Sequence, residues 1–246
     1  GVREVLVRVA GRSRSADDKE SVCRALYFFS DQAPMLLADE SVRDVLLQVV
    51  ASCADVRRMN VIALGFVMKV ACAESSQGHS HPVFAVPPVR DMLVACTWAV
   101  ANGVVKQFGA TALAALTRSD RGRELLATAE VRDVLVHVSS VYDVASTATV
   151  VLCALNSIGS CDRGRWVLAT AEVREVLVRC GRRAWSNEVD VRVAMVVQRI
   201  LRCDLGVRVM RSDGVRDMLV QLASREAFPH KEALCTLRKP ANFVPP

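Results

Sequence analysis

Long apolar runs, histidines and catalytic signatures are all scarce in this 246-residue sequence, and each scarcity narrows what the protein can be. The longest uncharged apolar stretch covers residues 61–68 and ends at Lys69, whereas a helix that spans a bilayer needs about 20 such residues. No GxSxG, HExxH or P-loop pattern is present. The four histidines are scattered, and none recurs beside a cysteine or serine at motif spacing: His79, His81, His137 and His230. We therefore expect no membrane-spanning segment, no enzymatic activity, no cofactor and no small-molecule substrate.

A metal site is not expected either. His79 and His81, together with Cys72 or Glu74, would supply donor atoms, but nothing in their spacing imposes a coordination geometry. The surrounding stretch, ESSQGHSHP at 74–82, is polar and contains glycine and proline. We predict that it is a solvated loop.

Cysteine occurs nine times but never as a CxxC pair. Cys96 and Cys180 occupy a column of the repeat described below in which the other copies carry valine or leucine. We therefore expect both to be buried thiols that act as small apolar side chains. Such cysteines are typical of a reducing compartment, which favours a cytoplasmic location, with the nucleus as the alternative.

Lysine is also scarce, because only five of the 32 basic residues are lysine. The basic residues are unevenly placed. Residues 1–172 carry 18 arginines and lysines against 18 acidic residues, whereas residues 173–246 carry 14 against eight, so the whole net charge of +6 lies in the last third. Arginine has the planar fork that suits carboxylates and phosphates, so this third is where an acidic partner is expected.

The sequence is rich in one repeated unit, VRDVL or a close variant. Its valines are separated by 40, 47, 42, 42 and 42 residues, and a fixed period of this length is typical of a solenoid. Within a copy, apolar residues stand at offsets 0, 3, 4 and 7 from the valine, which is the stripe of an amphipathic helix. We predict an all-α solenoid in which every copy opens a helix. The copies begin at Val2, Val42, Val89, Val131, Val173 and Val215.

Each copy is preceded and followed by further helical patterns. Short segments such as SDRGRELLATAE precede it, and we expect an aspartate to cap each short helix. A longer apolar stripe follows it. The four aspartates lie 11 residues before a repeat valine: Asp31, Asp120, Asp162 and Asp204. The predicted unit is thus a short helix H1, a helix H2 that begins with the VRDVL copy, and a long helix H3.

This three-helix unit resembles the armadillo repeat family. The resemblance rests on DRGRELLATAEVRDVLV (120–136), CDRGRWVLATAEVREVLV (161–178) and STATVVLCALNSIG (146–159), and it covers nearly the whole chain. It implies a right-handed superhelix of about five and a half units within a single domain, 1–246. The units start near 1, 41, 88, 130, 172 and 214, with an insertion at 74–82 and an extended tail at 239–246. The usual glycine between H1 and H2 and the usual proline at the start of H2 are missing, so the related HEAT class remains an alternative.

The Arg and acidic residues of the VRDVL copies permit two interpretations. One is a ladder of arginines that binds phosphates or an acidic peptide; the other is a structural ladder in which each arginine pairs with a carboxylate of its own or the next unit. We favour the structural ladder, because an acid in the first turn of a helix is stabilised there and the ladder carries no net charge. The pairs begin with Arg3–Glu4 and end with Arg216–Asp217.

The resemblance implies that an extended peptide binds along the concave face made by the H3 helices. In the importin and catenin branches of the family an H3 asparagine holds the peptide backbone, but the matching positions here are Ala115, Ser157 and Arg199. The H3 face instead changes from apolar and small to basic along the chain. Arginines around an aromatic side chain suit a carboxylate-rich peptide or a phosphate backbone. The candidate partner-binding residues are Arg182, Arg183, Trp185, Arg192, Met195, Arg199 and Arg202.

Two functions are consistent with these features, together with a purely structural role. The first is a non-enzymatic scaffold that binds a protein or peptide, expected to be acidic, on the H3 face. The alternative is an RNA- or DNA-binding repeat protein that uses the basic C-terminal third. A structural component of a larger assembly would need no partner on that face.

Overall fold

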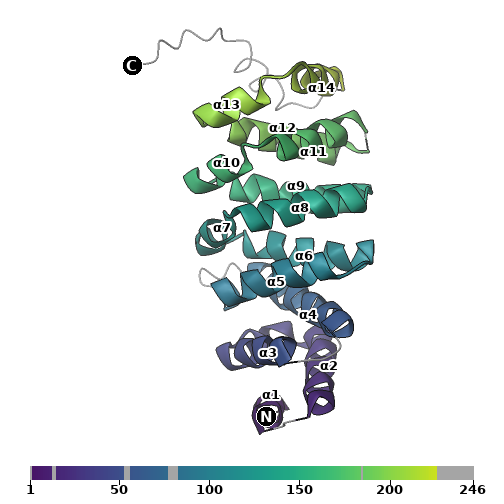
Figure 1. The fold of residues 1–246 in the computed structure, drawn as a ribbon, viewed down its shortest axis with the longest axis vertical. Helices are drawn as coiled ribbons and strands as arrows, with labels where there is room; N and C mark the ends of the chain where they lie inside the picture. The colour runs from purple at the N-terminus through teal and green to yellow at the C-terminus, as the bar shows by residue number, and fades with distance from the viewer. Residues whose placement is uncertain (1, 13–14, 53–55, 77–82, 184, 226–246) are drawn as a thin grey trace.

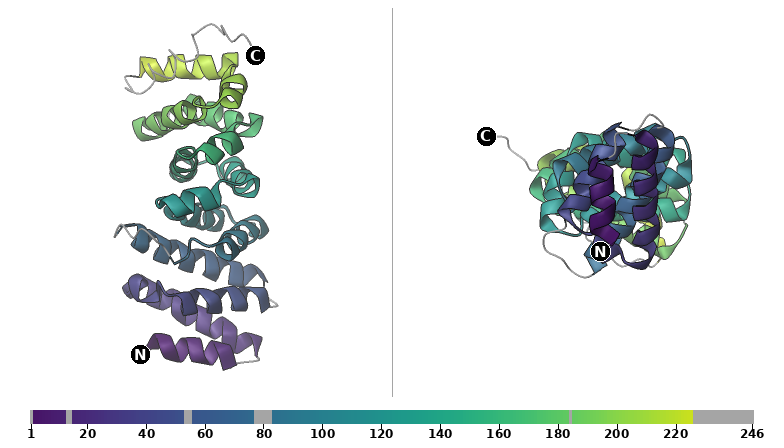
Figure 2. Two further views of the ribbon diagram at one scale, coloured as in Figure 1. Left: turned by 90° about the vertical axis from the view of Figure 1, so that its left-hand side faces the viewer. Right: turned by 90° about the horizontal axis from the view of Figure 1, so that it is seen from below.

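The computed structural model describes residues 2–12, 15–52, 56–76, 83–183 and 185–225, and within these residues the chain is all-α. Fourteen α-helices and one 3-10 helix, η1, follow one another without a β-strand in the described part. Figure 1 shows them stacked along one axis, with α1 at one end and α14 at the other. The side view in Figure 2 shows the same stack of successive layers. The arrangement is that of a helical repeat.

The predicted helix H2 is present in every unit. Each of these helices contains one VRDVL copy: α1 (Val2–Arg12), α3 (Glu40–Ser52), α5 (Pro87–Ala99), α8 (Ala129–Val141), α11 (Ala171–Arg182) and α14 (Asp213–Ser224). The H3 helices are α2 (Ala16–Gln32), α4 (Val56–Ser76), α6 (Gly103–Leu116), α9 (Ala145–Ile158) and α12 (Asn187–Ile200). The H1 helices are shorter: η1 (Pro34–Leu37), α7 (Asp120–Leu126), α10 (Asp162–Leu168) and α13 (Asp204–Met210).

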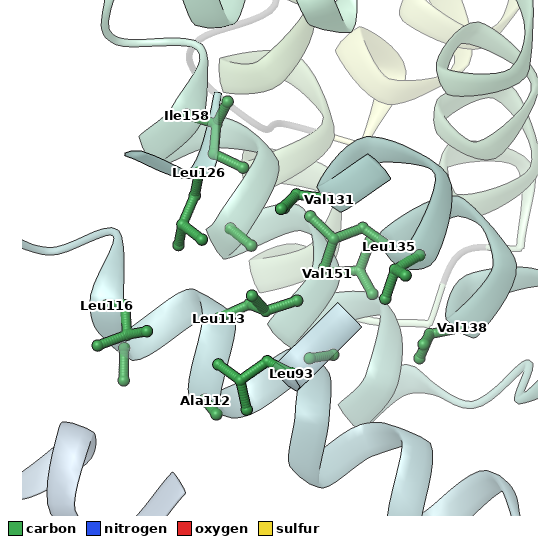
Figure 3. Close-up of a cluster of buried hydrophobic side chains, with 14 of the residues drawn as sticks. Leu93, Ala112, Leu113, Leu116, Leu126, Val131, Leu135, Val138, Val151 and Ile158 are labelled. Carbon is green, nitrogen blue, oxygen red and sulfur yellow. The ribbon is translucent and has the colours of Figure 1, made fainter. Parts of the chain in front are cut away.

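The apolar stripe of each VRDVL copy lies in the core, as its spacing predicts. In α8 the side chains of Val131, Leu135 and Val138 are fully buried, and Figure 3 shows Val131 and Leu135 beside Val151 of α9. Full burial of a valine or leucine side chain contributes roughly 1.5–3 kcal/mol to folding. The repeated stripe is therefore a large source of stability. Cys96 and Cys180 are also buried, which confirms their predicted place in the core.

The caps of the short helices differ from the prediction by one residue. Asp162 is the first residue of α10, and the residue before it, Cys161, is the N-cap. The Cys161 Sγ accepts a hydrogen bond from the Gly164 N–H at 3.4 Å, while Asp162 pairs with Arg165 at 2.9 Å. The same shift places Ser119 and Cys203 at the N-caps of α7 and α13. A short side chain one residue earlier reaches the free amides, whereas the aspartate remains favourable in the first turn.

Two further predictions need correction at the N-terminal end. Asp31 caps no short helix: it lies in the last turn of α2, and its carboxylate pairs with Lys69 of α4 at 2.6 Å. The predicted insertion at 74–82 is partly helical, because α4 continues to Ser76. The remainder of that insertion, 77–82, and the tail at 239–246 lie outside the described residues.

In four VRDVL copies the arginine pairs with the acid that follows it, at Arg3, Arg43, Arg90 and Arg132, whereas Arg216 pairs with Asp213 instead of Asp217. Arg132 pairs with Asp133 at 2.7 Å and also donates to the carbonyl oxygen of Val167, in the next unit, at 3.2 Å. Arg43 repeats both contacts, with Asp44 and with the carbonyl of Val83. Arg43 and Arg132, and Arg174 through the Val209 carbonyl, therefore join their own H2 helices to the unit that follows.

Candidate functional site

A groove on the H3 side, called the H3 groove below, is formed by residues of four consecutive H3 helices. These helices, α4, α6, α9 and α12, pack against one another in that order, and their side chains enclose a space of about 310 Å³. Because its walls come from units that follow each other along the stack, the groove runs along the solenoid. Its lining residues are Cys72, Thr111, Ala114, Ala115, Arg118, Val150, Cys153, Asn156, Ser157 and Arg192.

Polar groups are distributed along this groove. The Asn156 Oδ1 atom is buried and has no hydrogen-bond partner among the described residues. Arg118, just after α6, is exposed. Arg192 in α12 is half-buried and shares its guanidinium with Glu188, one turn earlier, at 2.7 Å. The groove therefore combines an unsatisfied amide acceptor with two arginines.

The two groove cysteines are poor nucleophiles. Burial raises the pKa of the Cys72 thiol above its usual value, and the positive charge of Arg118 only partly opposes this effect. Burial likewise raises the pKa of Cys153, although Arg192 and Arg118 lie near it. Because the thiolate is the reactive form, both side chains remain neutral thiols at physiological pH.

The structure separates the candidate residues that the sequence grouped together. Arg192 lines the H3 groove, while Arg182 and Arg183 line a different cavity of about 720 Å³ beside α11 and α14. Trp185 is half-buried, with the Arg183 guanidinium 5.9 Å from its ring centroid, and Arg183 also pairs with Asp143. Arg182 and Arg183 therefore lie apart from Arg192, in a different cavity.

The remaining candidates lie toward the end of α12. Met195 and Arg199 are half-buried, and Arg202, two residues past the helix, is exposed. The Arg199 side chain lies against Gly159, the C-cap of α9. None of the three lines the H3 groove.

Asn156 was missed by the comparison of sequence columns, which selected its neighbour Ser157. The helical spacing of the sequence around it would have identified it. Cys153, Asn156 and Ser157 stand at i, i+3 and i+4, and all three line the groove. Residues at these spacings share one helix face, so a prediction of the whole H3 face would have included Asn156 together with Cys153 and Ser157.

Other kinds of site were sought in the described residues. No group of three or more histidine, cysteine or acidic side chains is arranged to hold a metal ion there, and His79 and His81 lie outside the described residues. None of the described helices combines the length and the apolarity required to cross a bilayer.

Comparison with known proteins identifies the architecture alone. No protein-family model matches the sequence, and no curated protein matches it significantly. Among solved structures, the chain is similar to an engineered protein whose crystal structure was determined by the Northeast Structural Genomics Consortium. The TM-score is 0.66 at 17% sequence identity, over 96% of this chain and 98% of the other. At this identity the likeness shows that the two share an all-helical, repeat-like fold.

Proposed function

We propose that this chain is an armadillo-like interaction scaffold that binds an extended acidic peptide in the groove formed by α4, α6, α9 and α12. The observation that carries the proposal is the groove itself, because it follows the H3 helices over four units. A hollow whose walls come from successive units can hold part of an extended chain that runs along the stack. The order of H1, H2 and H3 in the later units supports the armadillo type of repeat.

Asn156 supports a contact with the peptide backbone. A carboxamide offers an acceptor oxygen and two donor hydrogens, which match the N–H and C=O groups of an extended peptide. The Oδ1 atom of Asn156 is buried without a partner among the described residues. A buried acceptor left unpaired costs about 1–3 kcal/mol, and a peptide N–H that reaches it would remove this cost.

The two groove arginines support an acidic partner. Arg118 and Arg192 come from different units, so they would contact side chains at separate positions of one peptide. Charge-assisted hydrogen bonds between guanidinium and carboxylate are about twice as strong as neutral ones. Glu188 holds Arg192 in the unbound protein, and an acidic peptide would compete with this carboxylate.

A role without catalysis agrees with the chemistry of the groove. The groove thiols have raised pKa values. The residues that line the groove include no histidine or carboxylate that would act as a base toward these thiols. The groove can therefore hold a ligand but lacks an activated nucleophile.

A binding assay with a defined probe tests the proposal. The probe is a fluorescein-labelled ten-residue peptide of alternating glutamate and alanine, followed by fluorescence anisotropy with the full chain. We expect Arg192→Glu and Asn156→Ala each to weaken binding by about tenfold, the effect of roughly 1.4 kcal/mol. Arg163→Glu is the matched control, because Arg163 is an exposed arginine in α10, away from the groove.

Two results would overturn the proposal. One is equal affinity for the probe in Arg192→Glu, Asn156→Ala and the unchanged protein. The other is tighter binding of a labelled oligouridylate than of the peptide, with an affinity that falls steeply with salt as phosphate contacts require. The second result would assign the chain to nucleic-acid binding instead.

A further inference from the structure

Two consecutive copies of the repeat, the fourth and the fifth, carry a glutamate just before the VRDVL valine, whereas the first three copies carry Gly1, Ser41 and Pro88 and the sixth carries a glycine. Glu130 and Glu172 occupy the second position of α8 and α11, but the equivalent residue of α14 is Gly214. In these two units the glutamate lies near the VRDVL arginine of the unit before it and that of its own unit. Hydrogen bonds with its own backbone and with Thr128 are the main reason why the pKa of the Glu130 carboxyl is lowered, and Arg90 and Arg132 lower it further.

Arg174 is the arginine that faces this substitution. Glu172, the equivalent of Glu130, lies near Arg132 of the preceding unit and also near Arg174 of its own unit, but α14 presents no corresponding glutamate to Arg174. Arg174 also makes no ion pair with any residue that the structure describes, unlike the equivalent Arg132, which pairs with Asp133. Its remaining contact with the next unit is a hydrogen bond to the carbonyl of Val209 at 3.4 Å. The glutamate that the two preceding units carry at this position is thus absent beside Arg174.

Extra arginines gather at the same place. Arg179, Arg182 and Arg183 belong to α11 and the residue that follows it, whereas the equivalent positions of α8 and the residues around its end carry His137, Ser140 and Val141. Together with Arg174 they line the cavity of about 720 Å³, in which Glu175 is the acidic lining residue. Asp143 neutralises Arg183, which leaves three arginines against one carboxylate. Part of the guanidinium of Arg179, its Nε atom, is buried without a hydrogen-bond partner among the described residues.

The glycine is not required by the packing. A Cβ atom at Gly214 would meet nothing closer than the Arg182 Nη2 atom at 3.8 Å and the Val178 methyl groups at 3.9 and 4.0 Å. These are ordinary contact distances, so a side chain would fit. The glycine therefore leaves room beside Arg182 and Val178, in a cavity that Arg174 and Arg179 also line.

We propose that this cavity binds a small, multiply charged oxyanion, a phosphate or pyrophosphate group, in the place of the missing carboxylate. Arginine forks bind the oxygens of such groups in pairs, and Arg174, Arg179 and Arg182 approach the space from one helix. The site lies on α11 and α14, so it is separate from the H3 groove and does not depend on the proposed function of that groove.

Titration calorimetry with sodium pyrophosphate tests the site, using the full chain and sodium chloride at equal ionic strength as the blank. The unchanged protein should give a saturable binding heat. Gly214→Glu should weaken this binding at least about tenfold, because the introduced carboxylate occupies the space and pairs with the arginines. Gly214→Ala is the matched control: it also removes the glycine but adds no charge and little volume, so affinity should remain within about threefold.

Melting temperatures show that each variant is folded, and they provide a second readout. Pyrophosphate should raise the melting temperature of the unchanged protein and of Gly214→Ala but not that of Gly214→Glu, since a ligand stabilises only a protein that binds it. Arg192→Glu, which alters the H3 groove, should bind pyrophosphate normally. The proposal is wrong if the unchanged protein gives no saturable heat, or if Gly214→Glu binds pyrophosphate as well as the unchanged protein does.

Discussion

Replacing Gly164 by alanine should destabilise the protein strongly, because the added carbon would strike the backbone of the preceding helix. An ideal Cβ at Gly164 lies 1.9 Å from the carbonyl oxygen of Ile158 and 2.7 Å from its carbonyl carbon. If the obstructing atoms belonged to a side chain, that side chain could rotate away, but they belong to the backbone at the end of α9, which cannot move without disturbing the packing of that helix. The hydrogen bond from the Gly164 N–H to the Cys161 Sγ holds α10 in place as well. Overpacking of this kind costs typically 1–3 kcal/mol, and a backbone clash lies toward the upper end, at about 2–3 kcal/mol.

Thermal unfolding followed by circular dichroism measures this effect. For a chain of this length 1 kcal/mol corresponds to about 2–4 °C in Tm, so a decrease of roughly 4–12 °C is expected. Gly206→Ala should behave alike, since its Cβ would lie 1.9 Å from the Ile200 oxygen. Gly214→Ala is the control: it has open space around it, and it should stabilise α14 by roughly 0.5–1 kcal/mol. If Gly164→Ala melted within about 1 °C of the unchanged protein, the close approach of α10 to α9 would be refuted.

Three further predictions concern buried or paired side chains. Burial, and then the charge of Lys106, lower the pKa of His137, whose Nε2 lies 2.8 Å from the Lys106 Nζ atom. His137 therefore binds a proton more readily in the unfolded chain than in the folded one. The free energy of unfolding should fall as the pH drops below about 6.5, by at most about 1.4 kcal/mol per pH unit. Denaturant titrations from pH 7 to 5 should show a smaller loss in His137→Gln, and an equal loss in both proteins would contradict this coupling. Arg132→Gln should cost about 1 kcal/mol in the same assay, because it removes the bonds to Asp133 and Val167. Arg216→Gln removes only an exposed pair with Asp213, whose charged atoms are 4.0 Å apart, and it should cost less than about 0.5 kcal/mol. If Arg132→Gln and Arg216→Gln lowered stability equally, that result would count against the structural ladder. Burial raises the pKa of Cys96 to about 12 and that of Cys180 to about 11, so mass spectrometry should detect iodoacetamide on either residue only after denaturation; rapid labelling of the folded protein would show that these sites open.

Local sequence patterns predicted the helices well where packing and pattern agree. The VRDVL stripe placed Val131 and Leu135 in the core, and its arginine and acid form the structural ladder. The pattern was less successful at helix ends. Aspartate was expected at the N-cap, but Cys161 occupies that position, since the start of a helix depends on backbone geometry that a residue's general preference does not specify.

The candidate site could be predicted only in part. Sequence columns identified Arg192 as a residue of the H3 face, and the structure places it in the H3 groove. They did not separate it from Arg182, which lies ten residues earlier but lines another cavity. Nearness along the chain is a poor guide here, because α11 and α12 are different helices and their side chains extend toward different surroundings.

The sequence by itself determined that this protein is a stack of similar helical units. A period near 42 residues, with an apolar stripe at helical spacing in every copy, buries its surface only when neighbouring copies pack together. Tertiary structure alone decided which side chains share a space. The groove at Asn156 draws its walls from four helices, and the cavity at Gly214 lies between α11 and α14. Contacts between units depend on how each helix is rotated and how closely it approaches the next, and the pattern of a single unit contains neither quantity.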